Sequence, residues 1–339
     1  MKSIVRVSAV IAALLFSFAA QADVVIKLGT LAPNGSPWHT LLKEMGQKWE
    51  QASGGKVKLR VYPGGVLGNE GDMIKKMRIG QLQAAAVTTI GLHDISPDPQ
   101  AVDVPGMIDS WATLDYVMDR MAPQLERAVE QKGYVVLGWS EVGFVRFFST
   151  KKLASLAEMQ GAKMFCWEGD PASADAWRAG GFHPVVMSST DIVPSLQTGL
   201  IDTVALAPLY AYSSRVFERA KFMLDLPWAV LTGATVVRKD DWDKVPADVR
   251  PKLIEISREY SKKIGLEVRR MDSEALDNMV KQGLVIVKPT SVPDYAKAAQ
   301  KTYDVIRNRV VPAVTFEEVK KLVDEAHARS AKNTPAPRP

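Results

Sequence analysis

The chain has 339 residues and carries 43 lysines and arginines against 38 aspartates and glutamates, a formal net charge of +5. This excess is too small and too evenly spread for a nucleic-acid-binding protein. The single cysteine, Cys166, excludes an intramolecular disulfide, so we expect packing to stabilise the fold and the thiol to be buried. A chain of this length is typical of two lobes rather than one core.

The first 22 residues have the pattern of a secretory signal peptide. Lys2 and Arg6 precede an apolar stretch over 9–18, and Ala20-Gln21-Ala22 is a small-residue cleavage site. The alternative is an uncleaved membrane anchor, but the apolar stretch is shorter than the ~20 residues that a membrane span needs. We therefore expect export, with the mature chain beginning at Asp23 and not embedded in a membrane.

Strand and helix patterns alternate from residue 24 to residue 205. Ser36 and Pro37 are expected as the N-cap and the first residue of the first helix. This order predicts an α/β fold whose repeated β-α-β pattern forms a second lobe and leaves a ligand cleft between the lobes. The expected strands are 24–28, 57–62, 84–87, 134–139, 143–149, 163–167, 183–186 and 203–205, and the expected helices are 38–52, 70–79, 109–132, 156–160, 173–179 and 191–198.

The segment 247–282 has apolar residues at helical spacing and few helix breakers. At ~1.5 Å per residue, one continuous helix would exceed the width of a lobe and could brace both lobes. Two shorter helices that meet near Gly265 are an equal alternative. The proline-rich end of the chain is expected to be a disordered tail.

Motifs for catalysis, metals and cofactors are missing. His39, His93, His183 and His327 are scattered, without metal-ligand spacing. The glycine-rich segment 63–68 lacks the Lys-Ser/Thr ending of a phosphate loop, and no G-x-S-x-G elbow occurs. We therefore expect no catalytic residues, no metal and no cofactor.

Aromatic and basic residues recur beside the ends of the predicted strands. Each aromatic residue could equally fill the core. Arg146 stands among apolar neighbours and needs an anionic partner, either a ligand carboxylate or an acid such as Glu168 or Asp170. The candidates are Trp139, Phe144, Arg146, Phe147, Phe165, Trp167, Trp177, Tyr210 and Tyr212.

Several short segments occur in a fixed order along the chain. They include Gly35-Ser36-Pro37, Tyr62-Pro63-Gly64-Gly65-Val66-Leu67-Gly68-Asn69-Glu70, Gly80-Gln81-Leu82-Gln83, Val104-Pro105, Gly143-Phe144-Val145-Arg146, Gly161-Ala162-Lys163-Met164 and Gly199-Leu200-Ile201-Asp202. Together they resemble the periplasmic solute-binding proteins of tripartite ATP-independent (TRAP) transporters, the DctP type. The combination is specific, although no single segment is.

The resemblance implies a two-lobe periplasmic binding protein fold, each lobe a mixed sheet flanked by helices, with a long helix bracing both lobes. It also implies a periplasmic location and delivery of one ligand to a membrane permease, by a monomer or a dimer. The implied layout is a signal peptide over 1–22, mainly lobe 1 over 23–145, mainly lobe 2 over 146–235, returning C-terminal helices over 236–330 and a tail over 331–339.

The chain departs from the family pattern at two positions. Phe165 stands where the family usually has an arginine that clamps the ligand carboxylate, and Thr203-Val204-Ala205-Leu206 lacks the acidic or amide residue often found after the Gly-x-x-Asp turn. Arg146 matches the family's second arginine. The phenyl ring of Phe165 cannot make the two parallel hydrogen bonds that an arginine makes to a carboxylate, and offers burial of apolar surface instead.

We therefore expect a larger, less polar or aromatic ligand, still with an acid that Arg146 could meet. The alternatives are a binding protein of an ATP-driven importer or a sensor, and an exported enzyme. The expected ligand-binding residues are Arg146, Phe165, Trp167, Trp177, Trp139, Phe144, Glu70 and Tyr210.

Overall fold

A computed structural model of the chain describes residues 23–168 and 171–333. The expected signal peptide and Asp170 lie outside the described residues, as does the expected tail from residue 334 onward. Residues 331–333, which were expected in the tail, belong to the last helix. In the described part of the chain, no helix has both the length and the apolar character needed to cross a membrane.

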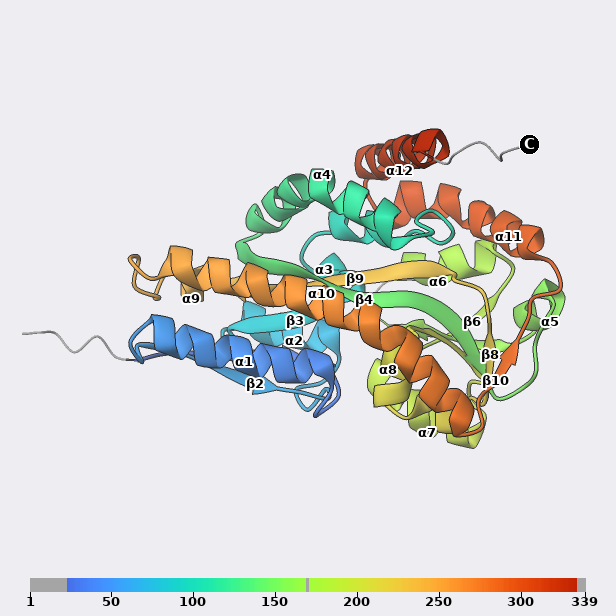
Figure 1. The fold of residues 1–339 in the computed structure, drawn as a ribbon, viewed down its shortest axis with the longest axis horizontal. Coiled ribbons are helices and arrows are strands. Elements are labelled where there is room, and N and C mark those ends of the chain that lie inside the picture. Colours follow the sequence, from blue (N-terminus) through green and yellow to red (C-terminus); the bar gives the residue numbers. More distant parts are fainter. Residues whose placement is uncertain (1–22, 169–170, 334–339) are drawn as a thin grey trace, which may run out of the picture.

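Ten strands form one mixed sheet that runs through the middle of the molecule (Figure 1). The main strand order is β2-β1-β3-β9-β4-β7-β5-β6, while β8 pairs with β4 and with β10. The strands are β1 (Val24–Thr30), β2 (Val57–Tyr62), β3 (Ala84–Thr88), β4 (Tyr134–Ser149), β5 (Lys163–Trp167), β6 (His183–Met187), β7 (Thr203–Leu206), β8 (Phe222–Leu224), β9 (Ala229–Arg238) and β10 (Val285–Val287).

The two strands expected over 134–139 and 143–149 are one strand, β4, so this expectation was wrong. The backbone between them stays paired with β9, so the strand is continuous. The pairing with β9 shifts register at Val136/Gly138 and at Glu141/Gly143, as at a β-bulge. Gly143 has φ of 130°, and an added Cβ would lie 3.0 Å from Cβ of Ala207. This glycine therefore allows both the backbone conformation and the close packing.

Strand β4 connects the two halves of the sheet. It is antiparallel to β9 as far as Val145 and then antiparallel to β7 from Arg146 onward. The expected lobe boundary at residue 145 falls inside this strand, and the lobe limits stay a prediction.

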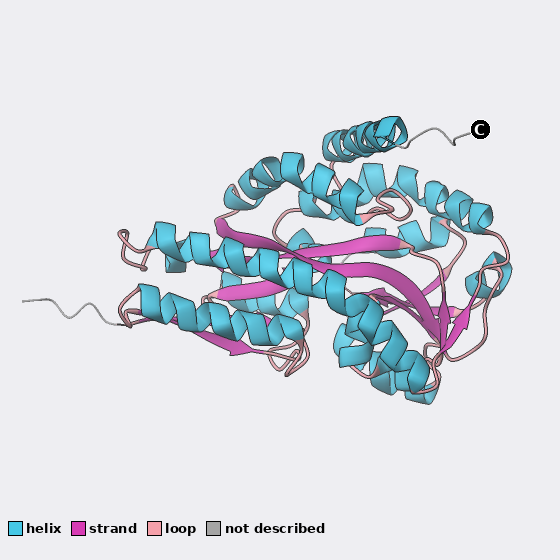
Figure 2. Cartoon of the chain, viewed as in Figure 1, coloured by secondary structure: helices cyan, strands magenta, loops and turns pink. Residues whose placement is uncertain are grey.

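Helices cover both faces of the sheet (Figure 2). The first helix begins as expected, because Ser36 accepts a hydrogen bond from the His39 amide and Pro37 is the first helical residue. The helices are α1 (Pro37–Ala52), α2 (Glu70–Arg78), α3 (Thr89–His93), α4 (Trp111–Glu130), α5 (Leu156–Gln160), α6 (Pro171–Ala179), α7 (Ile192–Thr198), α8 (Pro208–Ser213), α9 (Lys239–Trp242), α10 (Arg250–Lys281), α11 (Val292–Val305) and α12 (Ala313–Asn333).

Short helical turns complete the described chain. They are the 3₁₀ turns η1 (Asp98–Asp103), η2 (Ser189–Asp191) and η3 (Val216–Glu218) and the π-helical turn η4 (Ile306–Val310).

Helix α10 is one continuous helix of 32 residues, so the alternative of two helices is wrong. Its first half, including Leu253 and Tyr260, packs into the core around β1 and α1, whereas Met279 packs into the core around β7 and α7. Gly265 does not end the helix, and it gives room to the Glu141 side chain, whose carboxyl oxygen lies 3.1 Å from an added Cβ. The helix therefore braces both halves of the sheet (Figure 1).

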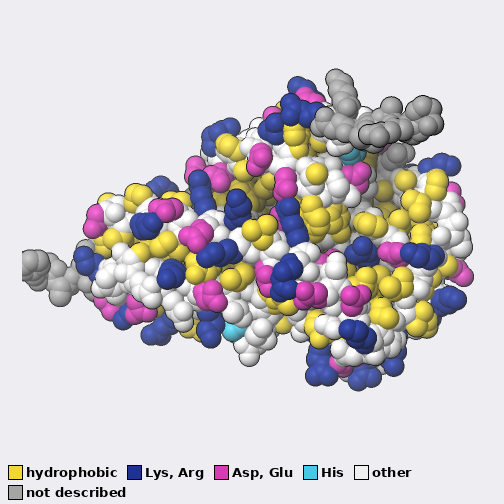
Figure 3. Space-filling model, in the orientation of Figure 1, with side chains coloured by type: hydrophobic (Ala, Val, Ile, Leu, Met, Phe, Trp, Pro, Cys, Tyr) yellow, Lys and Arg dark blue, Asp and Glu magenta, His cyan; other side chains and the backbone are white. Residues whose placement is uncertain are grey.

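Side chains of opposite charge are mixed on the face shown in Figure 3. Along α10, for example, Arg270 pairs with Glu267 and Glu274, and Lys263 pairs with Glu259. This face has no extended positive area of the kind that binds nucleic acid.

Candidate functional site

A cavity of about 160 Å³ lies between the two halves of the sheet. The N-terminus of α2, α3 and η1 line one side, and β5 and α6 line the other. Strand β9 and the turn η4 close it further. At the rim, the side-chain amide of Asn69 donates a hydrogen bond to Glu168 and lies 3.5 Å from Ser188 Oγ, so both sides meet there.

Glu70 stands at the first residue of α2 and is 4% exposed. Its carboxylate accepts hydrogen bonds from the Thr88 amide at 2.8 Å and from the Thr88 hydroxyl at 2.7 Å. Gly91 makes this burial possible, because an added Cβ would lie 2.7 Å from Glu70 Oε2. Burial raises the pKa of Glu70 to about 7, against the ordinary 4.5.

A second carboxylate, Asp103, ends η1 on the same side of the cavity. It accepts hydrogen bonds from the Thr232 hydroxyl at 2.8 Å, from the Thr232 amide at 3.2 Å and from the Thr89 hydroxyl. Burial raises the pKa of Asp103 to about 7. Both carboxylates are therefore anchored at the junction of β3 and α3, Glu70 by Thr88 and Asp103 by Thr89.

Aromatic side chains form the opposite wall. Phe165 and Trp167 come from β5, with their rings edge to face and 5.4 Å between centroids. Trp177 of α6 stacks on Trp228 with 5.7 Å between centroids and 17° between the ring planes. All four residues line the cavity, so the structure brings together Phe165, Trp167 and Trp177 as the sequence suggested.

Two lining residues have a buried polar atom without a partner among the described residues. They are the indole nitrogen of Trp228 and the hydroxyl of Ser189. An unpaired buried N–H or O–H is costly. Both atoms are fully buried, so neither is shown to face the open part of the cavity.

Arg146 does not line this cavity. Its neighbour Val145 does, and successive residues of a strand point to opposite faces. The guanidinium lies 3.8 Å from Asp272 and 3.8 Å from Asp225, while Glu168, an expected partner, bonds to Asn69 instead. Arg146 therefore pairs with acids other than the two expected, and its contact with a ligand stays a prediction.

Phe144 and Trp139 also lie outside the cavity lining. Phe144 is 8% exposed and packs edge to face on Trp111, with 4.7 Å between centroids. Trp139 packs against two core clusters, one under α4 and one under α2. Both residues therefore pack in the core, which was the alternative expected for each aromatic residue.

Tyr210 lines a second, smaller cavity of about 90 Å³. This cavity adjoins the first, because Glu70, Trp167 and Leu231 line both. Burial and the nearby Glu70 carboxylate raise the pKa of Tyr210 to about 12, so its hydroxyl stays protonated. The first and second cavities together include five of the eight expected residues.

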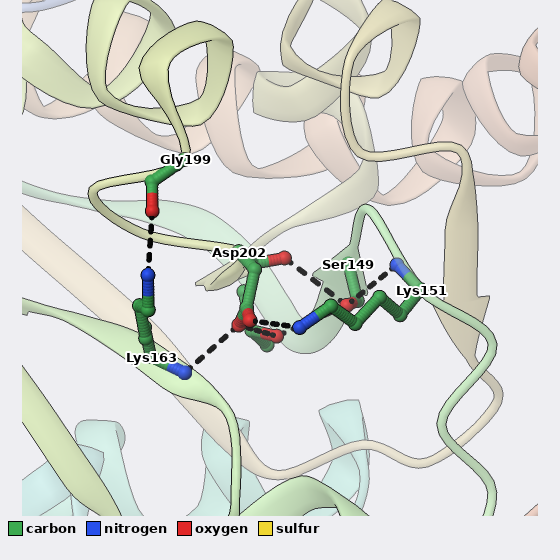
Figure 4. Close-up of polar contacts among 6 residues, drawn as sticks. Ser149, Lys151, Lys163, Gly199 and Asp202 are labelled. Carbon is green, nitrogen blue, oxygen red and sulfur yellow. Dashed lines mark hydrogen bonds and ion pairs between the residues drawn. The ribbon is translucent and has the colours of Figure 1, made fainter.

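The Gly199-Leu200-Ile201-Asp202 segment lines neither of the two cavities, and Asp202 makes structural contacts instead (Figure 4). Asp202 accepts hydrogen bonds at 2.8 Å from the Lys163 amide and from the Lys151 ammonium. Its backbone carbonyl accepts a hydrogen bond from Ser149 at 3.0 Å. Asp202 thus joins the ends of β4, β5 and β7.

The sequence did not reveal Asp103, Trp228, Ser189 or Val145 as lining residues. Asp103 directly precedes Val104-Pro105, one of the segments that resemble the family, and this position was the only sequence signal for Asp103. Trp228 stands in the connection before β9, and only the tertiary fold brings it against Trp177.

The charge of the cavity is unusual for a site that binds acids. Its described lining contains the carboxyl groups of Glu70, Asp94, Asp103 and Glu168, together with His93, and no lysine or arginine. His93 Nδ1 lies 2.8 Å from Gln100 Oε1. Among the residues described, no group of three or more potential ligands is placed to hold a metal ion.

The two-lobe fold and the interlobe cavity define an α/β solute-binding protein. Residues 28–309 match the family model of bacterial extracellular solute-binding protein, family 7 (DctP). The chain belongs to this family, whose members are solute-binding proteins of transport systems, as the sequence resemblance implied.

Two curated relatives differ in how much of their length is matched. The solute-binding protein RD1_1052 of Roseobacter denitrificans is 24% identical over 314 residues, 90% of this chain and 94% of that protein. The uncharacterized protein YiiZ of Salmonella typhimurium is 25% identical over 191 residues, 55% of this chain and 57% of that protein.

Solved structures show the same fold. The sugar acid binding protein of Advenella mimigardefordensis, in complex with galactonate, has a TM-score of 0.83 at 17% identity, covering 90% of this chain and 99% of that one. A TRAP periplasmic solute-binding protein of Desulfovibrio salexigens with bound orotic acid has a TM-score of 0.82 at 17% identity, covering 91% and 99%.

Proposed function

We propose that this protein is an exported receptor of a TRAP transporter, which binds a small organic molecule with an aromatic or otherwise apolar body and delivers it to the membrane permease. The observation that carries the ligand class is the aromatic wall of Phe165, Trp167, Trp177 and Trp228 in a cavity whose described lining has no lysine or arginine. The family membership supports the transport role.

The structural neighbours bind polar acids such as galactonate, and also the ring compound orotic acid. Their ligands do not transfer to this chain at 17% identity, but they show that the fold accepts both kinds of molecule. Fully burying one apolar side chain or ring stabilises by about 1.5–3 kcal/mol, so a ring held between Phe165 and Trp177 gains affinity without an ion pair.

The test is calorimetric titration of ligand-free protein with aromatic compounds, galactonate and a C4-dicarboxylate. Phe165→Leu should weaken binding of an aromatic compound about tenfold, because it removes the ring contact and roughly 1.4 kcal/mol. Phe217→Leu is the matched control, since Phe217 is buried in the same half and lines neither of the two cavities described above.

Tight binding of galactonate or the dicarboxylate alone, unchanged in Phe165→Leu, would contradict the proposed ligand class. Delivery is tested separately: uptake of the identified ligand by cells of the source organism should be lost when this protein is deleted. Unchanged uptake would contradict the receptor role.

A further inference from the structure

We infer that Asn69 and Glu168 form a latch at the rim of the first cavity, which stabilises the closed arrangement of the two halves of the sheet. This inference rests on the proposed function, because a receptor keeps its solute only while the cavity stays closed. It depends on the position of the two residues, on a second contact beside them, and on the way in which each residue is held in place.

The latch joins two segments that lie far apart in the sequence. Asn69 precedes α2, in the half formed by β1, β2 and β3, and Glu168 follows β5, in the half formed by β5, β6 and β7. Asn69 donates a side-chain hydrogen bond to Glu168 and lies 3.5 Å from Ser188 Oγ. Both residues line the first cavity, and their chain neighbours Glu70 and Trp167 line both cavities. The hydrogen bond therefore closes the rim directly beside the residues of the cavity wall.

A second contact joins the two halves next to the latch. A Cβ added to Gly65 would lie 3.2 Å from Cγ2 of Thr190, so the connection between β2 and α2 packs directly on this side chain. Backbone hydrogen bonds from Gly64 to Ala32 at 2.8 Å and from Gly65 to Thr30 at 3.0 Å fix the connection to the end of β1. Opening of the cavity at this rim must therefore break two neighbouring contacts.

The start of α2 fixes the direction of the Asn69 side chain. Its Oδ1 accepts a hydrogen bond from the Asp72 amide at 2.8 Å, and Asp72 accepts one from the Asn69 amide at 3.2 Å, which is a capping box. The side-chain nitrogen is then left to donate to Glu168. The backbone amide of Glu168 donates to Met187 at 3.1 Å. Because both residues are positioned before they meet, little conformational entropy is lost when the latch forms.

The strength of this bond sets the expected effect. The acceptor is a carboxylate, and hydrogen bonds to carboxylates are stronger than those between neutral groups. Glu168 is exposed, so water competes for the same oxygens and weakens the contact. We therefore expect loss of the latch to raise the ratio of open to closed protein about tenfold.

Distances between two spin labels, measured by pulsed electron paramagnetic resonance, report this ratio in ligand-free protein. The labels are attached at Ile79→Cys, at the end of α2, and at Leu200→Cys, after α7 in the other half, since these side chains are 69% and 55% exposed. Cys166 is buried and should stay unlabelled. We expect the unaltered protein to show mainly the shorter distance of the closed arrangement.

Three variants separate the hydrogen bond from other effects. Asn69→Asp keeps the helix cap, because aspartate caps as well as asparagine, but it replaces the donor with an oxygen that repels Glu168. Glu168→Ala removes the acceptor without adding a charge. Each should raise the share of the longer distance about tenfold relative to the shorter one.

The double variant Asn69→Asp with Glu168→Gln exchanges donor and acceptor. It should restore the ratio to within about threefold of the unaltered protein, because the glutamine amide can donate to the new carboxylate. Asn308→Asp is the matched control and should change nothing, since Asn308 is exposed and lines neither cavity.

Unchanged distances in both Asn69→Asp and Glu168→Ala overturn the latch. An opening by Asn69→Asp that persists in the double variant also overturns it, because the two residues would then act separately. Predominance of the longer distance in the unaltered protein overturns it as well. If one single variant does not fold, the other still decides. None of these results depends on a ligand, so the proposed ligand class can fail while the latch stands, and the reverse.

Discussion

Single residues decide what this cavity can bind. Phe165 lines the cavity at the position where the family pattern implies an arginine, and Arg146 lies outside the described lining, beside Asp272. Glu70 and Asp103 are held instead as buried acids by threonine donors. The proposed ligand class therefore rests on these positions rather than on the fold.

The two buried acids predict a dependence of stability on pH. Burial raises the folded-state pKa of Glu70 to about 7, and that of Asp103 to about 7, whereas both are near 4 when unfolded. Between these values the folded state keeps protons that the unfolded state loses, so stability falls as pH rises from about 4 to about 7. Each group changes the unfolding free energy by up to about 3–4 kcal/mol.

Denaturant unfolding of the ligand-free protein at pH 5 and pH 8 measures this effect. The unaltered protein should be more stable at pH 5, and Glu70→Gln and Asp103→Asn should each reduce the difference. If both variants show the same stability difference between pH 5 and pH 8 as the unaltered protein, groups other than Glu70 and Asp103 cause that difference.

Arg146 offers a prediction that separates its two possible roles. Arg146→Gln leaves Asp272 without the cation that pairs with it, while Asp225 keeps its ion pair with Lys288, and we expect a loss of about 1–3 kcal/mol in unfolding free energy. The affinity for the aromatic ligand should stay within twofold, because the side chain does not line either cavity described. A large loss of affinity with unchanged stability would restore the ligand role expected from the sequence.

At the scale of elements, β4 and α10 set the geometry between the two halves of the sheet. Helix α10 approaches β4 closely at Gly138, where an added Cβ would lie 2.8 Å from Cβ of Ser261. We expect Gly138→Ala to destabilise the protein by about 1–3 kcal/mol through overpacking. Gly161→Ala is the matched control, because its nearest neighbour would lie at an ordinary 3.5 Å.

Denaturant midpoints of both variants check this prediction. The control should stay within about 0.5 kcal/mol of the unaltered protein. Equal stability of the two variants would show that the α10–β4 contact adapts without cost.

Element patterns were predictable because they depend on local periodicity. Most of the strand and helix order from β1 to β7 and the position of Phe165 and Trp167 at the end of β5 followed from apolar spacing and turn residues, but α3 was not expected and β4 was expected as two strands. The face of Arg146 did not, because alternation along β4 separates two faces without telling which of them borders the cavity. Trp228 required tertiary contacts that no local pattern contains.

At the scale of the whole molecule, two halves of one sheet enclose a cavity and a single helix braces both (Figure 1). The account predicts a receptor that holds one aromatic solute between these halves and releases it unaltered. Its central claim is the kind of molecule bound.

Native mass spectrometry of protein exported and purified under mild conditions, followed by identification of the released molecule, tests this claim most directly. We predict one small aromatic compound per chain, chemically unchanged after release. A sugar acid or an aliphatic dicarboxylate in its place would contradict the account.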